Sequence, residues 1–315
     1  MEIKDIAGVG QPLTKLLEVI EKGVGKLYEP THLRRMALAK ADEIKVIEQA
    51  AMDAQLANAR QLSSLSEDTL LLLPGVPQEV IERAKLRLAR QEIGRQQNID
   101  RIVFEAAASM PRDVDSREVD TGWIARFFSA AADISHSDMQ KLWGRLLAGE
   151  TATPGRFNAR ALEVLKNLSA AEATLFSCAC TFVTGRNEFI IKIPVAEKKP
   201  VFLNYDDEAM ARLGLRFGDV LILVDAGLIL PGTDIGISLK LGDGKSPIRF
   251  LNNGRYFTLS LDGDRAQDQI SLNVYQFTSA GKDLGTLVPN NFNDAYFAVL
   301  TERFAVHGVK LALQH

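Results

Sequence analysis

The stretch EVIERAKLRLARQEIGRQQNIDRIVFEAAASM, residues 79–110, decides the fold of the first half of the chain. Charged and apolar residues follow one another through it in a helical pattern, and Pro111 comes directly after it. Because proline cannot continue a helix, this pattern predicts one long helix over residues 79–110.

A second long helix is predicted upstream, over residues 31–63, where Ala, Lys, Arg, Glu and Gln predominate and apolar residues are scattered. Between the two helices, a leucine run at residues 70–73 is followed by Pro74, Gly75 and Pro77, which favour a turn. Two long helices joined by such a turn predict an antiparallel helical hairpin.

Near the N-terminus we predict an amphipathic helix that ends at Pro30. Its apolar face recurs at three- and four-residue steps and consists of Leu13, Leu16, Leu17, Ile20, Val24 and Leu27. This face needs a cover, and lipid, another subunit or the chain's own helical bundle would each supply one. Residues 1–112 form the first predicted domain.

Residues 113–185 are predicted to form a compact helical domain. Its aromatic residues stand at helical spacing, which favours core packing: Trp123, Phe127, Phe128 and Trp143. Ser135 with Asp138, and Ser169 with Glu172, fit the capping pattern in which a hydroxyl accepts a hydrogen bond from a backbone N–H at a helix start. We expect the last helix to end at Gly185.

After Gly185 the apolar period changes from 3.6 towards 2, which is typical of strands. We expect strands at 189–193, 201–205, 235–241, 248–251, 256–261, 269–277 and 309–313, and helices at 206–213, 217–226, 279–288 and 294–307. The predicted fold class is therefore α+β. An all-α N-terminal half with a long helical hairpin is followed by a mixed α+β domain at residues 186–315.

Composition places the chain among globular proteins, with 46% hydrophobic residues, a formal net charge of -3 and a mean hydropathy of -0.02. Cys178 and Cys180 stand too close together for an unstrained disulfide, which fits a reducing compartment. The sequence shows neither a secretory leader pattern nor an apolar run of about 18 residues. We therefore expect a cytoplasmic protein.

No arrangement of reactive side chains points to a catalysed reaction. The sequence contains neither a nucleophile elbow nor a glycine-rich phosphate loop. The histidines are too scattered for two of them to share one helix face, which disfavours a zinc site: His32, His136, His307 and His315. We expect no enzyme, and no catalytic, cofactor-binding or metal-binding residues.

Arginines concentrate in the first part of residues 79–110. The candidate phosphate contacts are Arg83, Arg87, Arg90 and Arg95. Acidic residues, among them Glu82 and Glu92, are interleaved with them, and such mixed charge favours a solvated face. Nucleic-acid binding through this helix is therefore not favoured.

Two segments of the C-terminal half, DAGLI at residues 225–229 and YQFTSAGKDL at residues 275–284, resemble winged-helix domains. This resemblance implies that residues 217–226 form a recognition helix and that a wing precedes residue 275. The helix over 217–226 has no basic residue, whereas recognition helices that contact DNA carry several. We therefore expect it to be buried or to face protein.

Three further segments resemble a bacterial domain-of-unknown-function family, number 2806. They are GVGKLYEP at residues 23–30 with Arg34 and Arg35, MQKLWGRLLAGE at 139–150, and LKNLS at 165–169. The resemblance covers residues 10–185 and implies no activity. The glycine-flanked amphipathic helix followed by a charged helix is also similar to abortive-infection proteins at the level of fold.

These observations favour a non-enzymatic interaction or regulatory protein that self-associates through its N-terminal helices, in bacterial phage defence of the abortive-infection type. We expect a homo-oligomer, with a protein partner as a further possibility. Two alternatives stay open. One is a DNA-binding regulator that uses the winged-helix-like element, and the other is a peripheral membrane effector that uses the amphipathic N-terminal helix.

Overall fold

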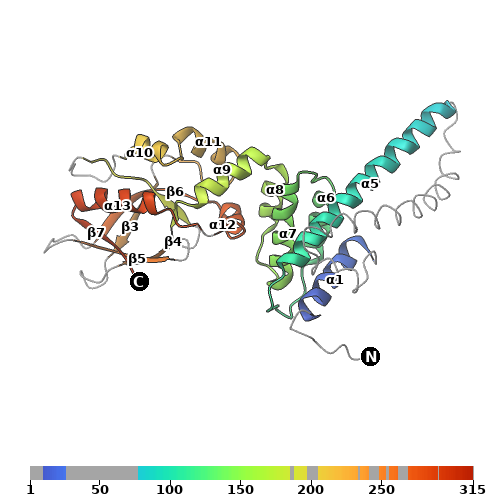
Figure 1. The fold of residues 1–315 in the computed structure, drawn as a ribbon, viewed down its shortest axis with the longest axis horizontal. Helices are drawn as coiled ribbons and strands as arrows, with labels where there is room; N and C mark the ends of the chain where they lie inside the picture. Colours follow the sequence, from blue (N-terminus) through green and yellow to red (C-terminus); the bar gives the residue numbers. More distant parts are fainter. Residues whose placement is uncertain are drawn as a thin grey trace. The chain divides into compact units, whose positions relative to one another are not determined.

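The computed structural model describes residues 10–25, 77–184, 188–196, 205–232, 235–240, 248–252, 255–261, 269–289 and 291–314. The chain divides into two compact units, Met1–Arg156 and Phe157–His315 (Figure 1). Helices make up the described part of the first unit, and strands and helices the second, which confirms the α+β fold class. The predicted boundaries after residues 112 and 185 do not coincide with this division, because elements on both sides of each boundary pack together.

The first unit is a helical bundle. Its described helices are α1 (Gly10–Val24), α5 (Gln78–Ser109), α6 (Thr121–Ala131) and α7 (Ser137–Ala152). Helix α5 packs against α6 and α7, and α1 packs against the same two helices. Between them lies an aromatic core in which the ring of Phe127 is 5.2 Å from the rings of Trp123, Phe128 and Trp143, measured between centroids. The long helix predicted over residues 79–110 is confirmed.

The apolar face of α1 is covered by the bundle of its own unit. Leu16 and Ile20 are fully buried, and Leu13 and Leu17 are buried nearly as completely. A Cβ on Gly23 would lie 2.1 Å from the ring of Phe128 in α6, which shows how closely the two helices approach. Of the three covers left open by the sequence, the structure provides the chain's own bundle.

This burial corrects the prediction that the face of α1 serves self-association or membrane contact. The four buried leucine and isoleucine side chains are not available in the folded unit. Val24 is half-buried, and Leu27 lies outside the described residues. Helix α1 also ends earlier than predicted, at Val24, where Gly25 takes a φ of 82° that only glycine adopts readily.

The predicted start of α7 is also wrong. The residue before the helix is His136 rather than Ser135, and no side chain caps the first turn. The buried side chain of Gln140 donates hydrogen bonds to the Ile134 carbonyl, at 2.9 Å, and to Asn98 of α5, at 3.2 Å. At the start of α7 the structure therefore shows a side-chain contact with α5 and no local cap. The helix over residues 31–63 and residues 70–76 of the turn lie outside the described residues, and Pro77 directly precedes α5.

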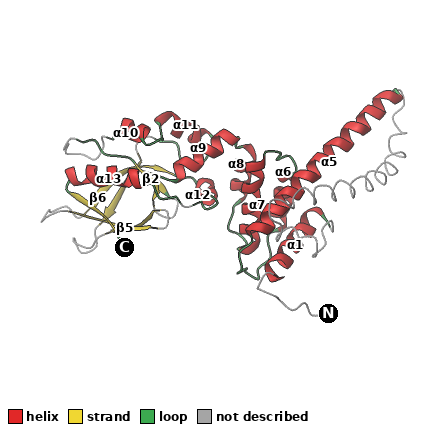
Figure 2. Ribbon diagram, in the orientation of Figure 1, coloured by secondary structure: helices red, strands yellow, loops and turns green. Residues whose placement is uncertain are grey.

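The second unit combines two antiparallel sheets with short helices (Figure 2). The first sheet has the strand order β1-β2-β6-β3, and the second β4-β5-β7. The strands are β1 (Val183–Thr184), β2 (Phe189–Ile191), β3 (Ile235–Lys240), β4 (Ile248–Asn252), β5 (Arg255–Leu261), β6 (Gln269–Gln276) and β7 (Val309–Leu313). The helices are α8 (Ala159–Asn167), α9 (Ala170–Cys180), α10 (Asp207–Arg212), α11 (Phe217–Asp225), α12 (Ser279–Gly285) and α13 (Asp294–Val306).

Most predicted elements of this unit are confirmed, with shifted ends. Ser169 and Glu172 form the predicted capping box at the start of α9. That helix ends at Cys180 instead of Gly185, and Gly185 itself is not among the described residues. Of the strand expected at 201–205, only Tyr205 is described, where it forms an isolated bridge with Pro194.

The two segments that carry the winged-helix resemblance lie against each other. The hydroxyl of Thr278, just before α12, donates to the Gly227 carbonyl at 2.7 Å. A Cβ on Gly281 would lie 2.1 Å from the backbone carbonyl oxygen of Leu228, so this position accepts no side chain without a backbone shift. The likeness to winged-helix domains itself stays a prediction.

Candidate interaction surface

The N-terminal half of α5, residues 78–93, exposes most of its side chains to solvent. Within it only Ile81 and Lys85 are half-buried, and the others are exposed. All buried residues of α5 belong to its other half: Ile99, Ile102, Val103, Ala106 and Ala107. Figure 1 shows the same division, with the beginning of α5 extending past α6 and α7 of its own unit. With respect to the described residues, half of this helix therefore contributes surface rather than core.

Four large apolar side chains of this half are exposed to solvent. The exposed fractions are 61% for Leu86 and 59% for Leu88, and Val80 and Ile93 are exposed as well. With 3.6 residues per turn, Leu86 and Ile93 lie on one side of the helix, between Glu82 and Arg90. We call these four residues, Glu82, Leu86, Arg90 and Ile93, the Leu86 stripe. Leu88 points about 200° away from Leu86 around the helix axis.

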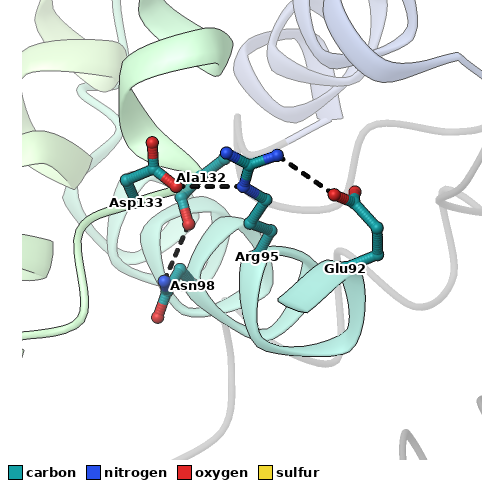
Figure 3. A network of polar contacts seen from close by, with 5 residues as sticks. All are labelled: Glu92, Arg95, Asn98, Ala132 and Asp133. Atoms are coloured by element: carbon teal, nitrogen blue, oxygen red, sulfur yellow. Dashed lines mark hydrogen bonds and ion pairs between the residues drawn. The ribbon is translucent and has the colours of Figure 1, made fainter. Parts of the chain in front are cut away.

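The candidate phosphate contacts divide into two groups. Arg83, Arg87 and Arg90 are exposed and succeed one another at steps of four and three residues, so they share one face of α5. Arg95 is engaged elsewhere: its Nε lies 3.0 Å from Oδ1 of Asp133, and its Nη1 lies 3.0 Å from Oε1 of Glu92 (Figure 3). The hydrogen bonds to these two carboxylates raise the pKa of Arg95.

The contacts of Arg95 fasten α5 to the end of α6. Next to Arg95 on the helix, Asn98 Nδ2 donates to the carbonyl of Ala132 at 2.8 Å (Figure 3). Asp133 follows Ala132 directly, so two neighbouring residues after α6 accept hydrogen bonds from α5. Arg95 therefore has a structural partner, and the exposed arginines of this face are the other three.

The second unit contains a groove between α9 and the segment that leads from α10 into α11. Its volume is about 430 Å³, and Leu175, Cys178, Gly214 and Arg216 are among its lining residues. Burial, followed by the charge of Asp219, raises the pKa of the Cys178 thiol. The thiolate is the nucleophilic form, so this environment disfavours nucleophilic chemistry at Cys178.

Lys192, which no sequence pattern predicted as a functional residue, is buried in the second unit. Its Nζ lies 3.7 Å from the ring centroid of Tyr205 and 4.4 Å from that of Tyr275. The adjacent cavity, lined in part by Lys192 and Tyr205, has a volume of only about 10 Å³. That is room for one water molecule and not for a substrate. In the sequence, this lysine directly follows a predicted strand. Nothing in that local pattern indicates that two tyrosines from distant segments lie on either side of its side chain.

In the described part of the chain, no group of three or more His, Cys, Asp or Glu side chains could hold a metal ion. Among the same residues, no helix has the length and apolar character needed to cross a membrane.

Comparison with known proteins places the chain in a family. The family described as "Protein of unknown function (DUF2806)" matches residues 82–301, from the first turns of α5 to α13. No curated protein and no solved structure matches the chain. The predicted family is confirmed, and the match extends through the second unit, beyond the segment that carried the resemblance. The link to phage defence stays a prediction. The chain belongs to the DUF2806 family.

Proposed function

We propose that this chain is a non-enzymatic interaction protein that self-associates through the Leu86 stripe of α5. The observation that carries the proposal is the exposure of Leu86 and Ile93 on a half-helix without a fully buried side chain. Exposed apolar side chains grouped on one face are typical of surfaces that bind another protein. The proposal keeps the N-terminal helices as the site of association and moves it from α1 to α5.

The charges of the stripe are suited to a second copy of the same helix. Glu82 lies four residues before Leu86, and Arg90 lies four residues after it. In an antiparallel pair of α5 helices centred on Leu86, Glu82 of each copy lies opposite Arg90 of the other. Such a two-fold arrangement forms the charge pair twice and buries both copies of Leu86.

Replacing Leu86 by glutamate tests the proposal. Burial of one leucine contributes about 2 kcal/mol, so loss of both copies raises the dissociation constant roughly 1000-fold. Light scattering after size-exclusion chromatography should give a lower mass for Leu86→Glu than for the unmodified chain at equal concentration.

Leu88→Glu is the matched control, because Leu88 is almost equally exposed and points to another side of the same helix. We expect this variant to keep the mass of the unmodified chain. Equal masses for all three proteins, or an equal loss in both variants, would contradict the proposal.

The three exposed arginines of α5 support a second candidate, the binding of a phosphate backbone. Arg83, Arg87 and Arg90 lie on one face and are all accessible. Binding to duplex DNA should then weaken steeply with salt, and Arg87→Gln should reduce that salt dependence. The absence of a gel shift at about 50 mM salt would eliminate this candidate.

A further inference from the structure

The sheet formed by β4, β5 and β7 has one buried face and one outward face. On β5, Phe257 and Leu259 are buried, whereas Tyr256 is 55% exposed. On β7, Lys310 is exposed and its neighbours on both sides are buried. Side chains along a strand point alternately to the two faces of a sheet, so the strand register assigns one set of residues to the outward face. We call this set the Tyr256 face: Arg249, Tyr256, Thr258, Ser260, Lys310 and Ala312.

Both charged residues of the Tyr256 face are basic. Arg249 and Lys310 are exposed, and neither side chain has an ion pair among the described residues. None of the strands β4, β5 and β7 contains Asp or Glu. Although the whole chain has a formal net charge of -3, this face therefore attracts a negatively charged ligand.

The strand register places the two cations on opposite sides of Tyr256. Arg249 lies on β4, two residues from the partner of Tyr256, which makes it a diagonal neighbour at about 7–8 Å. Lys310 lies on β7 opposite Ser260, about 12 Å from Arg249 across the sheet. Between them Thr258 is buried, and its hydroxyl donates to the carbonyl of Ala312 at 3.4 Å. Short side chains thus form a floor beside one exposed aromatic ring and two cations.

An exposed tyrosine ring beside unpaired cations is suited to a single-stranded nucleic acid. The bases of a single strand are free to stack on aromatic side chains, and its phosphates bind Arg and Lys. A duplex keeps its bases stacked inside the helix and offers this face only phosphates. An acidic protein segment would pair with Arg249 and Lys310 but would leave the ring of Tyr256 without a matching group.

We propose that the Tyr256 face binds single-stranded DNA. Tyr256 stacks on one base, and Arg249 and Lys310 bind phosphates on the two sides of it. None of these contacts needs a 2′-hydroxyl, so a DNA strand contains every group that the face recognises. The site belongs to the second unit and is independent of the Leu86 stripe and of the exposed arginines of α5.

Fluorescence anisotropy of a labelled oligo-dT of about 12 nucleotides, with the full chain at about 50 mM salt, tests the proposal. Tyr256→Ala should weaken binding roughly 5- to 150-fold, the range expected for the loss of one stacked base. Tyr256→Phe keeps the aromatic ring and should keep the affinity. The proposal is overturned if the unmodified chain does not bind at roughly 100 µM, or if Tyr256→Ala binds as well as the unmodified chain. An equal loss in Tyr256→Phe would overturn the stacking contact as well.

The two cations are tested by the salt dependence of the same binding. Arg249→Gln and Lys310→Gln each remove one phosphate contact, so each should reduce the slope of log affinity against log salt by about 0.7. Lys166→Gln is the matched control, because it removes one charge from an exposed position of α8 and should leave the slope unchanged. An equal change in all three variants would show that only the net charge matters and would overturn the site.

Competition experiments separate the Tyr256 face from other occupants and from α5. An unlabelled duplex of the same length, and poly-glutamate, should each compete roughly tenfold less well than unlabelled oligo-dT. Equal competition by either one, or binding of oligo-rU without binding of oligo-dT, overturns the proposal. If Arg87→Gln abolishes binding and Tyr256→Ala does not, the oligonucleotide binds α5 and the Tyr256 face is overturned.

Discussion

Tyr296 is fully buried in the second unit, where its hydroxyl donates a hydrogen bond of 2.5 Å to the carbonyl of Ile191. Burial raises the pKa of this phenol well above its usual value of about 10, and it also raises the pKa of the Cys180 thiol. The folded state keeps these protons where the unfolded chain releases them. The contribution of these two groups to the free energy of unfolding is therefore fully present below their ordinary pKa values. It is lost as the pH rises above those values.

Tyr296→Phe should reduce this loss of stability at alkaline pH. At neutral pH we expect a loss of about 1 kcal/mol in the free energy of unfolding, because the hydrogen bond to Ile191 disappears. Above pH 10 the stability of the variant should fall less steeply than that of the unmodified chain. Urea denaturation at a series of pH values measures both effects. The exposed Tyr256, as Tyr256→Phe, is the control that should keep the unmodified pH profile.

Capping residues show what a local sequence signal can and cannot determine. Ser169 and Glu172 satisfy each other within one turn, so their pattern suffices to predict the start of α9. Ser135 and Asp138 have a similar spacing, yet α7 begins beyond Ser135. The hydrogen bonds of Gln140 to Ile134 and to Asn98 of α5 accompany that start, and a contact with a helix so distant in sequence leaves no local pattern.

The contact between α5 and α7 depends on one glycine. A Cβ on Gly144 would lie 2.4 Å from Cβ of Glu105 and 2.8 Å from the backbone nitrogen of Ala106. We expect Gly144→Ala to lower the free energy of unfolding of the first unit by about 1–3 kcal/mol, because backbone atoms must move. On α5, Gly94→Ala meets no atom within 4 Å and should stabilise the helix by up to about 1 kcal/mol. Chemical denaturation of the two variants should thus give shifts of opposite sign.

The spacing of apolar residues predicts where a helix forms better than it predicts which elements pack against that helix. The length of α5 follows from residues 79–110 and Pro111, and the apolar face of α1 follows from its three- and four-residue steps. Neither pattern indicates which elements cover the helix. For α1, these elements are α6 and α7. The Leu86 stripe was not predicted for the same reason. An apolar residue is recognised as exposed only when the positions of all other elements are known.

The two units have separate cores, and Gly281 tests the second one. Because a Cβ there would collide with the backbone oxygen of Leu228, Gly281→Ala should destabilise the second unit by about 1–3 kcal/mol. We expect the far-ultraviolet circular dichroism of the variant to show an earlier thermal transition. A melting curve that coincides with that of the unmodified chain would contradict this close approach.

Both tryptophans of the chain, Trp123 and Trp143, belong to the aromatic core of the first unit. Indole fluorescence therefore records only that core, whereas circular dichroism of the backbone sums over both units. A difference between the two signals during heating separates the melting of one unit from that of the other without cutting the chain. The emission spectrum thus serves as a built-in optical label for half of the protein.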